Sequence, residues 1–344
     1  MVRINRSWTG KKEGCVRVKE QFYCETVKHQ EYGEIIVLKS EDRESGKTQK
    51  IYLTPEYGFN LAKYEVDGED LIYTMPDVLR EEGFSGIPIL YPTPNRVRDA
   101  QFRFKGQSYL QQKKGERRYL HGLVYDERWT AGRPMLTEQG AQVSAWIDFE
   151  EDKIWFQSFP WKHRLTVTWK LKSSGIRLEY EVHNQDEKEL PYGFAIHPYF
   201  PVKAYGETAA VCVPAKKMFE STQERFPTGN IFDITGTEYD LCKSRIVTEL
   251  KLDDVYTGLG RTESEIRYGS HGLILSASEE FKQMVVYTPE MDFFCLENQT
   301  CMTDAHNFYD KGYKNSGIIL VRPGGVRSGW IELDSTRTGT LNEK

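Results

Sequence analysis

Residues 164–184, RLTVTWKLKSSGIRLEYEVHN, decide the fold prediction. Apolar and polar side chains alternate through both halves of this stretch, which is the period of a β-strand with one buried face. The two halves are separated by residues 172–175, KSSG, and serine and glycine favour a tight turn. The stretch therefore predicts an antiparallel hairpin that packs one face against a core.

The same signature recurs along most of the chain. Short segments rich in β-branched and aromatic residues, bounded by Gly, Pro, Asn or Asp, are predicted as strands. They are residues 33–40, 50–58, 141–150, 153–160, 272–278, 284–290, 317–324 and 328–333. A short helix is predicted at residues 76–83, PDVLREEG, which begin with proline and end with glycine. Without a repeat or an interdomain linker, residues 1–344 are predicted to form a single all-β domain, a β-sandwich or a large barrel.

Composition excludes several classes of protein. Hydrophobic residues make up 39% of the 344 residues and aromatic residues 13%, which is enough for a large core. The net charge of −5 and the lack of a long basic run argue against a nucleic-acid partner. No stretch approaches the roughly twenty apolar residues of a membrane-spanning helix. Residues 1–14 are charged and lack the apolar core of a secretory signal, so we predict a cytoplasmic protein.

The cysteines do not form a metal or disulfide pattern. Six are scattered along the chain without a CxxC pair, which favours reduced thiols, at Cys15, Cys24, Cys212, Cys242, Cys295 and Cys301. Cys295, Cys301 and His306 could be read as metal ligands, but their spacing fits no zinc pattern and a fourth ligand is missing nearby. We therefore predict no metal.

Two ionisable residues lie next to irregular or glycine-containing segments. Asn95 and Arg96 come after a proline-rich run, ILYPTP, that predicts a stiff loop. Arg96 could offer several planar donors to hydroxyl groups, or it could pair with an acidic neighbour at the surface. His121 is followed by Gly122, which leaves room for a ligand to approach, although a histidine here could equally hydrogen-bond a turn.

His197 lies in the apolar stretch YGFAIHPYF, residues 192–200. Pro198 biases the histidine backbone towards an extended conformation, so the ring would project from a fixed strand end. Aromatic neighbours would then surround it, namely Tyr192, Phe194, Tyr199 and Phe200. Aromatic faces suit the C–H faces of a sugar ring and equally suit a core, so both interpretations stay open.

Glu297 follows an apolar run in FFCLENQT, residues 293–300. A buried glutamate has a raised pKa, which makes it a better base near neutral pH. Alternatively, strand alternation would point Glu297 outward from an edge strand.

Taken together and in order, these motifs resemble the aldose 1-epimerases of the galactose mutarotase type. The matching motifs are Asn-Arg, Leu-His-Gly, His-Pro-Tyr-Phe and the apolar Leu-Glu-Asn-Gln-Thr, at residues 95–96, 120–122, 197–200 and 296–300. The resemblance extends over nearly the whole chain. It implies a large antiparallel β-sandwich, the supersandwich, with a small sugar as substrate and no cofactor.

The resemblance also implies a set of site residues. Glu297 would take the proton of the C1 hydroxyl, His197 would protonate the ring oxygen, and His121 would assist. The substrate-binding residues would be Asn95, Arg96 and Asp253, with the adjacent Asp254 as the alternative aspartate. The implied reaction interconverts the α and β anomers of a free aldose by acid–base ring opening.

Two alternatives remain open at this point. A hexose-6-phosphate 1-epimerase would perform the same chemistry with a basic anchor for the phosphate, for which Arg98, Arg128, Lys162 and Arg164 are candidates. A non-catalytic carbohydrate-binding or regulatory module would use the fold without the chemistry. The sequence leaves the oligomeric state open.

Overall fold

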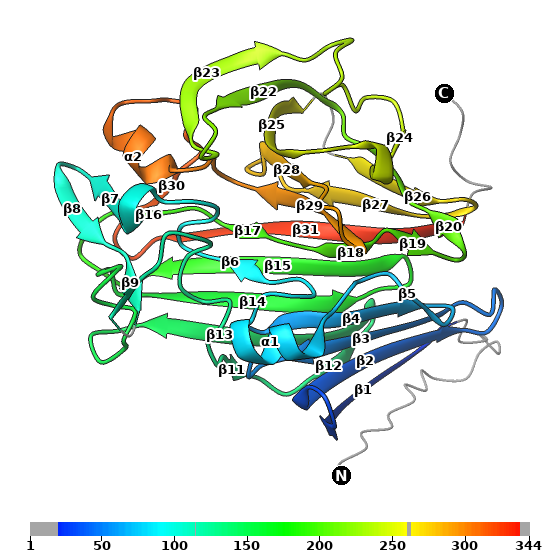
Figure 1. The fold of residues 1–344 in the computed structure, drawn as a ribbon. Coiled ribbons are helices and arrows are strands. Elements are labelled where there is room, and N and C mark those ends of the chain that lie inside the picture. The colour runs from blue at the N-terminus through cyan, green and yellow to red at the C-terminus, as the bar shows by residue number, and fades with distance from the viewer. Residues whose placement is uncertain (1–19, 114, 260–262, 338–344) are drawn as a thin grey trace.

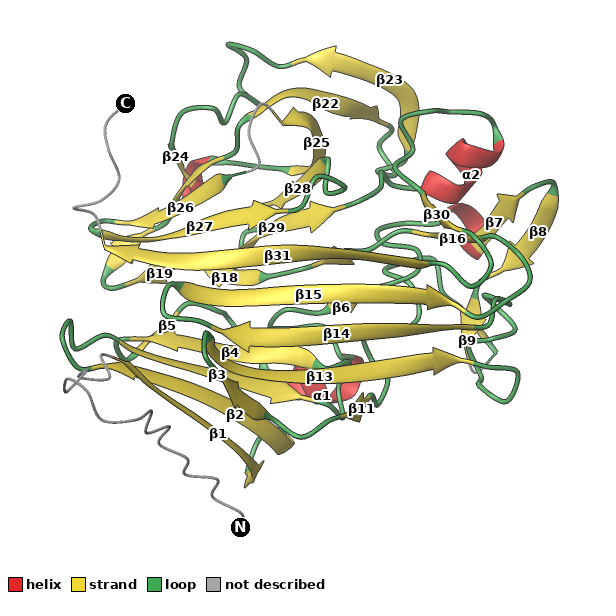
Figure 2. Ribbon diagram, turned by 180° about the vertical axis from the view of Figure 1, so that it is seen from behind, coloured by secondary structure: helices red, strands yellow, loops and turns green. Residues whose placement is uncertain are grey.

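The computed structural model describes residues 20–113, 115–259 and 263–337, which fold as stacked antiparallel β-sheets (Figures 1 and 2). Cys15 and residues 1–14, on which the argument about secretion rests, lie outside the described residues. No disulfide bond links the described cysteines to one another. Within the same residues, no helix has the length and apolar character needed to cross a membrane.

Residues 164–184 form the hairpin that their alternation predicts. Strands β14 (His163–Leu171) and β15 (Gly175–Asn184) pair in antiparallel register, with Leu171 opposite Ile176. The Lys172 N–H closes the turn by donating to the Gly175 carbonyl at 2.8 Å. Every second side chain of β14 is buried, including Trp169, so one face packs on the core.

This hairpin lies in the middle of a sheet that we call the large sheet. Its strands run in the order β11 (Thr130–Ala131), β13 (Gly140–Phe149), β14, β15, β31 (Val326–Arg337), β27 (His271–Ala277), β26 (Ser264–Tyr268), β21 (Ala210–Cys212) and β24 (Arg245–Ile246), with β12 (Met135–Thr137) beside β13.

A second sheet, which we call the site sheet, lies in front of the large sheet in Figure 1. Its strands run in the order β23 (Pro227–Asp233), β22 (Ala215–Ser221), β25 (Asp253–Leu259), β28 (Gln283–Tyr287), β29 (Phe293–Gln299), β17 (Ala195–Ile196) and β6 (Ile89–Leu90), with β18 (Tyr199–Pro201) also beside β29.

A third sheet comes from the N-terminal part of the chain: β1 (Glu20–His29), β2 (Gly33–Asp42), β3 (Thr48–Thr54), β4 (Asn60–Val66) and β5 (Glu69–Asp70). The short pairs are β7 (Gln101–Phe104) with β8 (Gln107–Leu110), β9 (Gln112–Lys113) with β10 (Glu116–Arg117), β16 (Leu190–Tyr192) with β30 (Ile319–Val321), and β19 (Lys203–Ala204) with β20 (Glu207–Thr208). The helical segments are α1 (Pro76–Glu82), α2 (Ala305–Asp310) and the 3₁₀ turns Arg98–Ala100 and Val247–Glu249.

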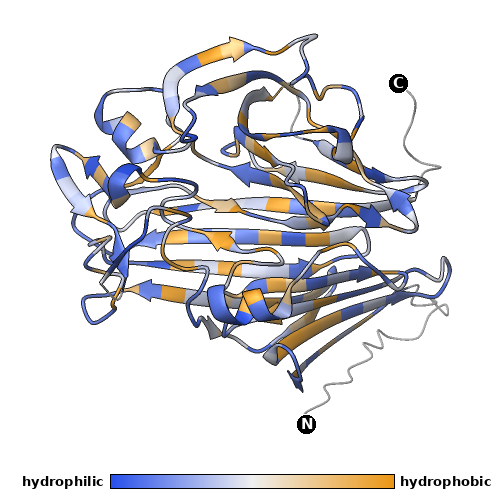
Figure 3. Ribbon diagram, in the orientation of Figure 1, coloured by the Kyte–Doolittle hydropathy of each residue, from blue (hydrophilic) through white to orange (hydrophobic). Residues whose placement is uncertain are grey.

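The core lies between the sheets and draws on all three. Leu53, Trp169 and Leu296 belong to one buried cluster, although they come from the N-terminal, large and site sheets. Figure 3 shows the alternation of apolar and polar residues along the long strands that makes this layering possible. The predicted all-β sandwich is therefore confirmed.

Alternation along β29 determines which side of the site sheet carries the chemistry. Phe294 and Leu296 face the core between the sheets. Phe293 and Cys295 point to the opposite face, where they join a separate cluster with Tyr199. Because successive strand residues alternate, Glu297 must share this second face. The site sheet thus presents its outer face as the floor of a site.

Two local predictions have different outcomes. Helix α1 forms at the predicted place, and Gly83 ends it in the left-handed conformation with φ +70° while its N–H donates to the Leu79 carbonyl. The predicted strand at residues 153–160 is wrong, because this segment folds as consecutive turns. Its aromatic residues Trp155 and Phe159 are buried in the core all the same. The apolar content of the segment therefore reflects core packing and not pairing in a sheet.

Candidate active site

A buried histidine–glutamate pair lies at the centre of the outer face of the site sheet. His197 Nε2 is 3.2 Å from Glu297 Oε1, and the two residues are only 5% and 2% exposed. Glu297 Oε2 accepts a hydrogen bond of 3.0 Å from Gln299 Nε2, which lies two residues along β29 on the same face. The outward orientation from an edge strand is excluded, because β29 is an interior strand and Glu297 is buried.

Burial changes the proton affinities of this pair in opposite directions. It raises the pKa of Glu297 to about 8, while the hydrogen bond from Gln299 opposes the rise. It lowers the pKa of His197 to about 3. Between these values the two groups together bind one proton. An imidazolium acid beside a carboxylate base would place two charges here, but burial disfavours both charges and so favours a neutral imidazole beside a carboxylic acid.

The backbone around His197 fixes the direction of its ring. His197 follows β17 directly, and its N–H donates to the Pro88 carbonyl at 3.0 Å. Tyr199 stacks on the imidazole with ring centroids 4.9 Å apart. The other three aromatic residues predicted to surround His197 are Tyr192, Phe194 and Phe200. Their rings contact other aromatic residues and not His197. The expectation of four surrounding aromatic residues is thus correct for Tyr199 alone.

His121 lies beside His197, with ring centroids 5.2 Å apart and nearly perpendicular planes. Its N–H donates to the Asn95 carbonyl at 2.8 Å. Burial lowers the pKa of His121 well below its usual value, and His197 and Arg96 lower it further. Phe84, just after α1, stacks on His121 at 4.8 Å and meets His197 edge-on at 4.9 Å.

Gly122 has a different purpose from the one that the sequence argument gave it. A Cβ on this residue would lie 2.3 Å from the Tyr91 carbonyl oxygen, and its φ is +77°. The glycine is therefore needed for the close approach of two backbone segments and not for the approach of a ligand.

An arginine–aspartate pair lies next to the acid–base pair. Arg96 Nη2 is 3.5 Å from Asp253 Oδ2, and the two side chains are 30% and 25% exposed. The Asn95 side-chain oxygen accepts from the Arg96 N–H at 2.8 Å and from Arg96 Nη1 at 3.4 Å, so Asn95 orients the arginine. Asp253 raises the pKa of Glu297 and Arg96 lowers it, so the three groups are close enough to interact electrostatically.

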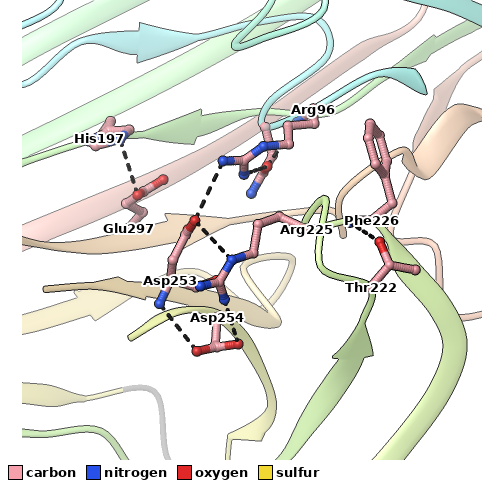
Figure 4. A network of polar contacts seen from close by, with 9 residues as sticks. Arg96, His197, Thr222, Arg225, Phe226, Asp253, Asp254 and Glu297 are labelled. Atoms are coloured by element: carbon pink, nitrogen blue, oxygen red, sulfur yellow. Dashed lines mark hydrogen bonds and ion pairs between the residues drawn. The ribbon is translucent and has the colours of Figure 1, made fainter. Parts of the chain in front are cut away.

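The structure distinguishes the two adjacent aspartates. Asp253 is the one that reaches Arg96, while Asp254 Oδ1 lies 3.4 Å from Arg225 Nη1. Arg225 also contacts Asp253, with Nε 3.5 Å from the carboxylate (Figure 4). The sequence offers no sign that Arg225 would reach the site, because it belongs to an ordinary turn between β22 and β23.

All the residues predicted to form the site thus come together on one face of the fold. Sequence reasoning missed Phe84, Gln299 and Arg225. Gln299 could have been found, since it lies two residues after Glu297 and strand alternation gives both the same face. Phe84 and Arg225 carry no comparable signal.

The alternative metal site is not formed. Among the described residues, no group of three or more His, Cys, Asp or Glu side chains is arranged to hold a metal ion. Cys295 and Cys301 belong to separate buried clusters, and His306 Nε2 is 3.3 Å from the Pro191 carbonyl.

Two hollows lie away from the acid–base pair. One includes Tyr205 and His271, and the other includes Tyr313 and Lys314. Neither is lined by His197, Glu297 or the residues around them. The candidate site is therefore marked by the buried His197–Glu297 pair and not by either hollow.

The chain has relatives of known sequence and structure. The sequence model of the aldose 1-epimerase family matches residues 53–334. The uncharacterized protein YihR of Escherichia coli K12 is 21% identical over 227 residues, which cover 64% of this chain and 71% of YihR.

Solved structures share the fold. A galactose mutarotase-like protein from Clostridium acetobutylicum superposes with a TM-score of 0.77 at 20% identity, covering 93% of this chain and 99% of that one. The galactose 1-epimerase of Lactobacillus acidophilus NCFM superposes with a TM-score of 0.70 at 16% identity, covering 93% and 99%. With the family match extending over most of the sequence, the chain belongs to the aldose 1-epimerase family.

Proposed function

We propose that this protein interconverts the α and β anomers of a free aldose, with Glu297 as the base and His197 as the acid. The observation that carries the proposal is the buried contact of 3.2 Å between His197 Nε2 and Glu297 Oε1. A sugar must lose a proton from its C1 hydroxyl and gain one at its ring oxygen, and both oxygens are bonded to C1. Two adjacent side chains can therefore serve both positions.

The proton count of the pair suits this reaction. At neutral pH the pair holds one proton, and transfer from Glu297 to His197 converts the neutral form into a carboxylate beside an imidazolium. A bound sugar would replace the direct contact with two hydrogen bonds, one from the C1 hydroxyl to Glu297 and one from His197 to the ring oxygen. The nearby Arg96 lowers the pKa of Glu297 and so favours the carboxylate.

Ring opening and closure then balance without any other reactant. The C1 hydroxyl gives its proton to Glu297, the C1–O5 bond breaks, and His197 gives its proton to O5. This leaves the neutral pair, which is the form that burial favours, beside an open-chain aldehyde. After rotation about the C1–C2 bond, closure reverses both transfers on the other face of the carbonyl and restores the ionic form.

Burial and aromatic packing support the catalytic interpretation over a binding module. Burying a carboxyl and an imidazole side by side costs free energy that sugar recognition alone does not require. Phe84 and Tyr199 cover the two histidine rings and limit access of water to them. We propose that His121 hydrogen-bonds the ring oxygen or a neighbouring hydroxyl, while Arg96 and Asp253 bind the remaining hydroxyls.

The charge arrangement favours an uncharged sugar over a hexose 6-phosphate. The candidate phosphate anchors outside the site each contact a carboxylate at 2.6–2.7 Å: Arg128 with Glu56, Lys162 with Glu151, and Arg164 with Asp148. Arg98 lies nearer the site, but it stacks on Phe226 at 4.0 Å and faces Glu224 at 3.7 Å. A phosphate would have to compete with these partners.

The decisive experiment follows the anomeric equilibration of freshly dissolved α-glucose, α-galactose and other free aldoses by polarimetry or proton NMR. Acceleration by the wild type, lost in Glu297→Gln and His197→Asn, would support the proposal. The matched controls are Glu290→Gln and His183→Asn, which change the same residue types outside the site and should keep full activity. Acceleration of hexose 6-phosphates alone would favour the phosphosugar enzyme, and no acceleration of either class would leave the binding module.

A further inference from the structure

We propose that Arg225 is a specificity-determining residue that binds, together with Asp253, a pair of neighbouring hydroxyl groups on the part of the sugar away from C1. This inference rests on the proposed function and extends it to the choice of substrate. Arg225 lies in the turn between β22 and β23, and its Nε contacts the same Asp253 oxygen, Oδ2, that Arg96 reaches (Figure 4).

Contacts to β25 hold the guanidinium of Arg225 in one orientation. Nη1 donates to the Asp253 backbone carbonyl at 3.0 Å and lies 3.4 Å from Asp254 Oδ1. Nε is 3.5 Å from Asp253 Oδ2. Because the guanidinium is planar, these contacts also fix the direction of its remaining nitrogen, Nη2.

The turn that carries Arg225 is itself well ordered by hydrogen bonds. The Arg225 N–H donates to the Thr222 carbonyl at 3.0 Å, and the Thr222 N–H donates to the Phe226 carbonyl at 2.8 Å. Arg98 places its guanidinium 4.0 Å from the centre of the Phe226 ring, which ties the turn to the loop that carries Arg96. The arginine is therefore presented from a supported position and loses little freedom on binding.

Arg225 and Asp253 keep unused hydrogen-bonding capacity. Among the described residues, neither Arg225 Nη2 nor Asp253 Oδ1 takes part in a hydrogen bond. Arg225 thus keeps an unused donor, and the Asp253 carboxylate that it contacts keeps an unused acceptor. Each sugar hydroxyl both donates and accepts, so two neighbouring hydroxyls complement this pair. A phosphate dianion offers acceptors only and would face the Asp253 carboxylate, so the pair disfavours it.

The position of Arg225 indicates which end of the sugar it meets. Arg96 and Asp253 are close enough to Glu297 to change its pKa. Arg225 lies beyond Asp253, further from the acid–base pair (Figure 4). With C1 held at Glu297 and His197, Arg225 would contact ring substituents remote from the reacting carbon and would affect binding more than turnover.

The test compares the best aldose substrate with its analogues deoxygenated at single positions away from C1, in the wild type and in Arg225→Met. We expect Arg225→Met to raise KM for the parent sugar roughly 10-fold or more, with kcat nearly unchanged, because a hydrogen bond from a charged group is lost. The wild type should discriminate against at least one deoxy analogue, and Arg225→Met should lose that discrimination, because the analogue already lacks the hydroxyl concerned. Arg225→Lys keeps the charge without the planar fork and should behave like Arg225→Met.

The control is Arg267→Ala, since Arg267 is 44% exposed, against 42% for Arg225, and also pairs with a carboxylate, but in the large sheet. Its KM and its discrimination should equal those of the wild type. An active wild type whose KM and deoxy-sugar discrimination are unchanged in Arg225→Met would overturn the assignment of Arg225 alone. A wild type that accelerates no free aldose would overturn the proposed function and this assignment with it.

Discussion

The two halves of the proposed site differ in burial, and we expect this difference to separate proton transfer from substrate binding. His197 and Glu297 are 5% and 2% exposed, and burial shifts their pKa values until the pair shares one proton. The Arg96 and Asp253 side chains are 30% and 25% exposed, so water and their mutual contact stabilise both charges. One sheet face therefore carries a dry half suited to moving protons and a wetter half suited to binding hydroxyls.

The strongest test of this comparison removes the proton-transfer groups. Glu297→Gln and His197→Asn should each lower kcat by roughly a hundred- to ten-thousand-fold, the usual contribution of a positioned acid or base, with little change in KM. Stopped-flow polarimetry or NMR exchange measures the rates, and circular dichroism verifies the fold. Near-normal turnover in either variant would remove that residue from the mechanism.

A change in the exposed half should act on binding instead. Arg96→Ala should raise KM roughly 10- to 100-fold, the equivalent of about 1.5–3 kcal/mol, and leave kcat within a few-fold of the wild type. Titration of sugar into the inactive Glu297→Gln protein, with and without Arg96→Ala, measures the binding loss independently of turnover. If Arg96→Ala lowered kcat as severely as Glu297→Gln, the separation between the two halves would be wrong.

The buried half should also make stability depend on pH. The pKa of Glu297 is about 8 in the folded protein and near 4.5 when unfolded, so the folded state binds more protons between these values. The stability from Glu297 is thus present below pH 4.5 and is lost as the pH rises towards 8. Glu297→Gln lacks this loss. As the pH rises across that range, its free energy of unfolding should therefore increase relative to that of the wild type by up to a few kcal/mol. Urea unfolding at several pH values measures it.

The contribution of His197 to stability should depend on pH in the opposite direction, and the same experiment measures it. Its pKa is about 3 in the folded protein, against 6.5 when unfolded, so its contribution is present above pH 6.5 and is lost as the pH falls towards 3. The free energy of unfolding of His197→Asn should therefore increase relative to that of the wild type as the pH falls. Parallel stability curves for wild type and both variants would contradict the opposed pKa shifts.

The smallest expected effect concerns the aromatic cover of the dry half. Phe84→Leu removes the ring that stacks on His121, which is worth about 0.5–1.5 kcal/mol, so kcat should fall only roughly 2- to 10-fold. Water should reach the imidazole, and the pKa of His121 should rise towards its usual value. NMR titration of the imidazole protons reports this pKa, with Phe232→Leu at an exposed position as the control. An unchanged His121 pKa would show that Phe84 does not control access of water.

Most of the fold followed from local pattern. Strict alternation identified β14 and β15, and the proline and glycine that bound residues 76–83 identified α1. Residues 153–160 show the limit of that method. Their aromatic content is the same in a strand or in turns that reach the core, and only the surrounding packing distinguishes the two. That residues 1–344 form one domain, and that the protein is cytoplasmic, stay predictions.

The sequence by itself determined which chemical groups are proposed for the site, because Arg96, His121, His197 and Glu297 lie in recognisable motifs. It also identified the family, through the order of those motifs. Only the tertiary structure decided their state. Burial depends on residues distant in the chain, and burial is what raises the pKa of Glu297 and lowers that of His197. The same is true of Arg225, which reaches Asp253 because β22 and β25 are neighbours in the sheet. A pairing between distant strands leaves no mark in the local sequence, so this arginine became visible only in the folded chain.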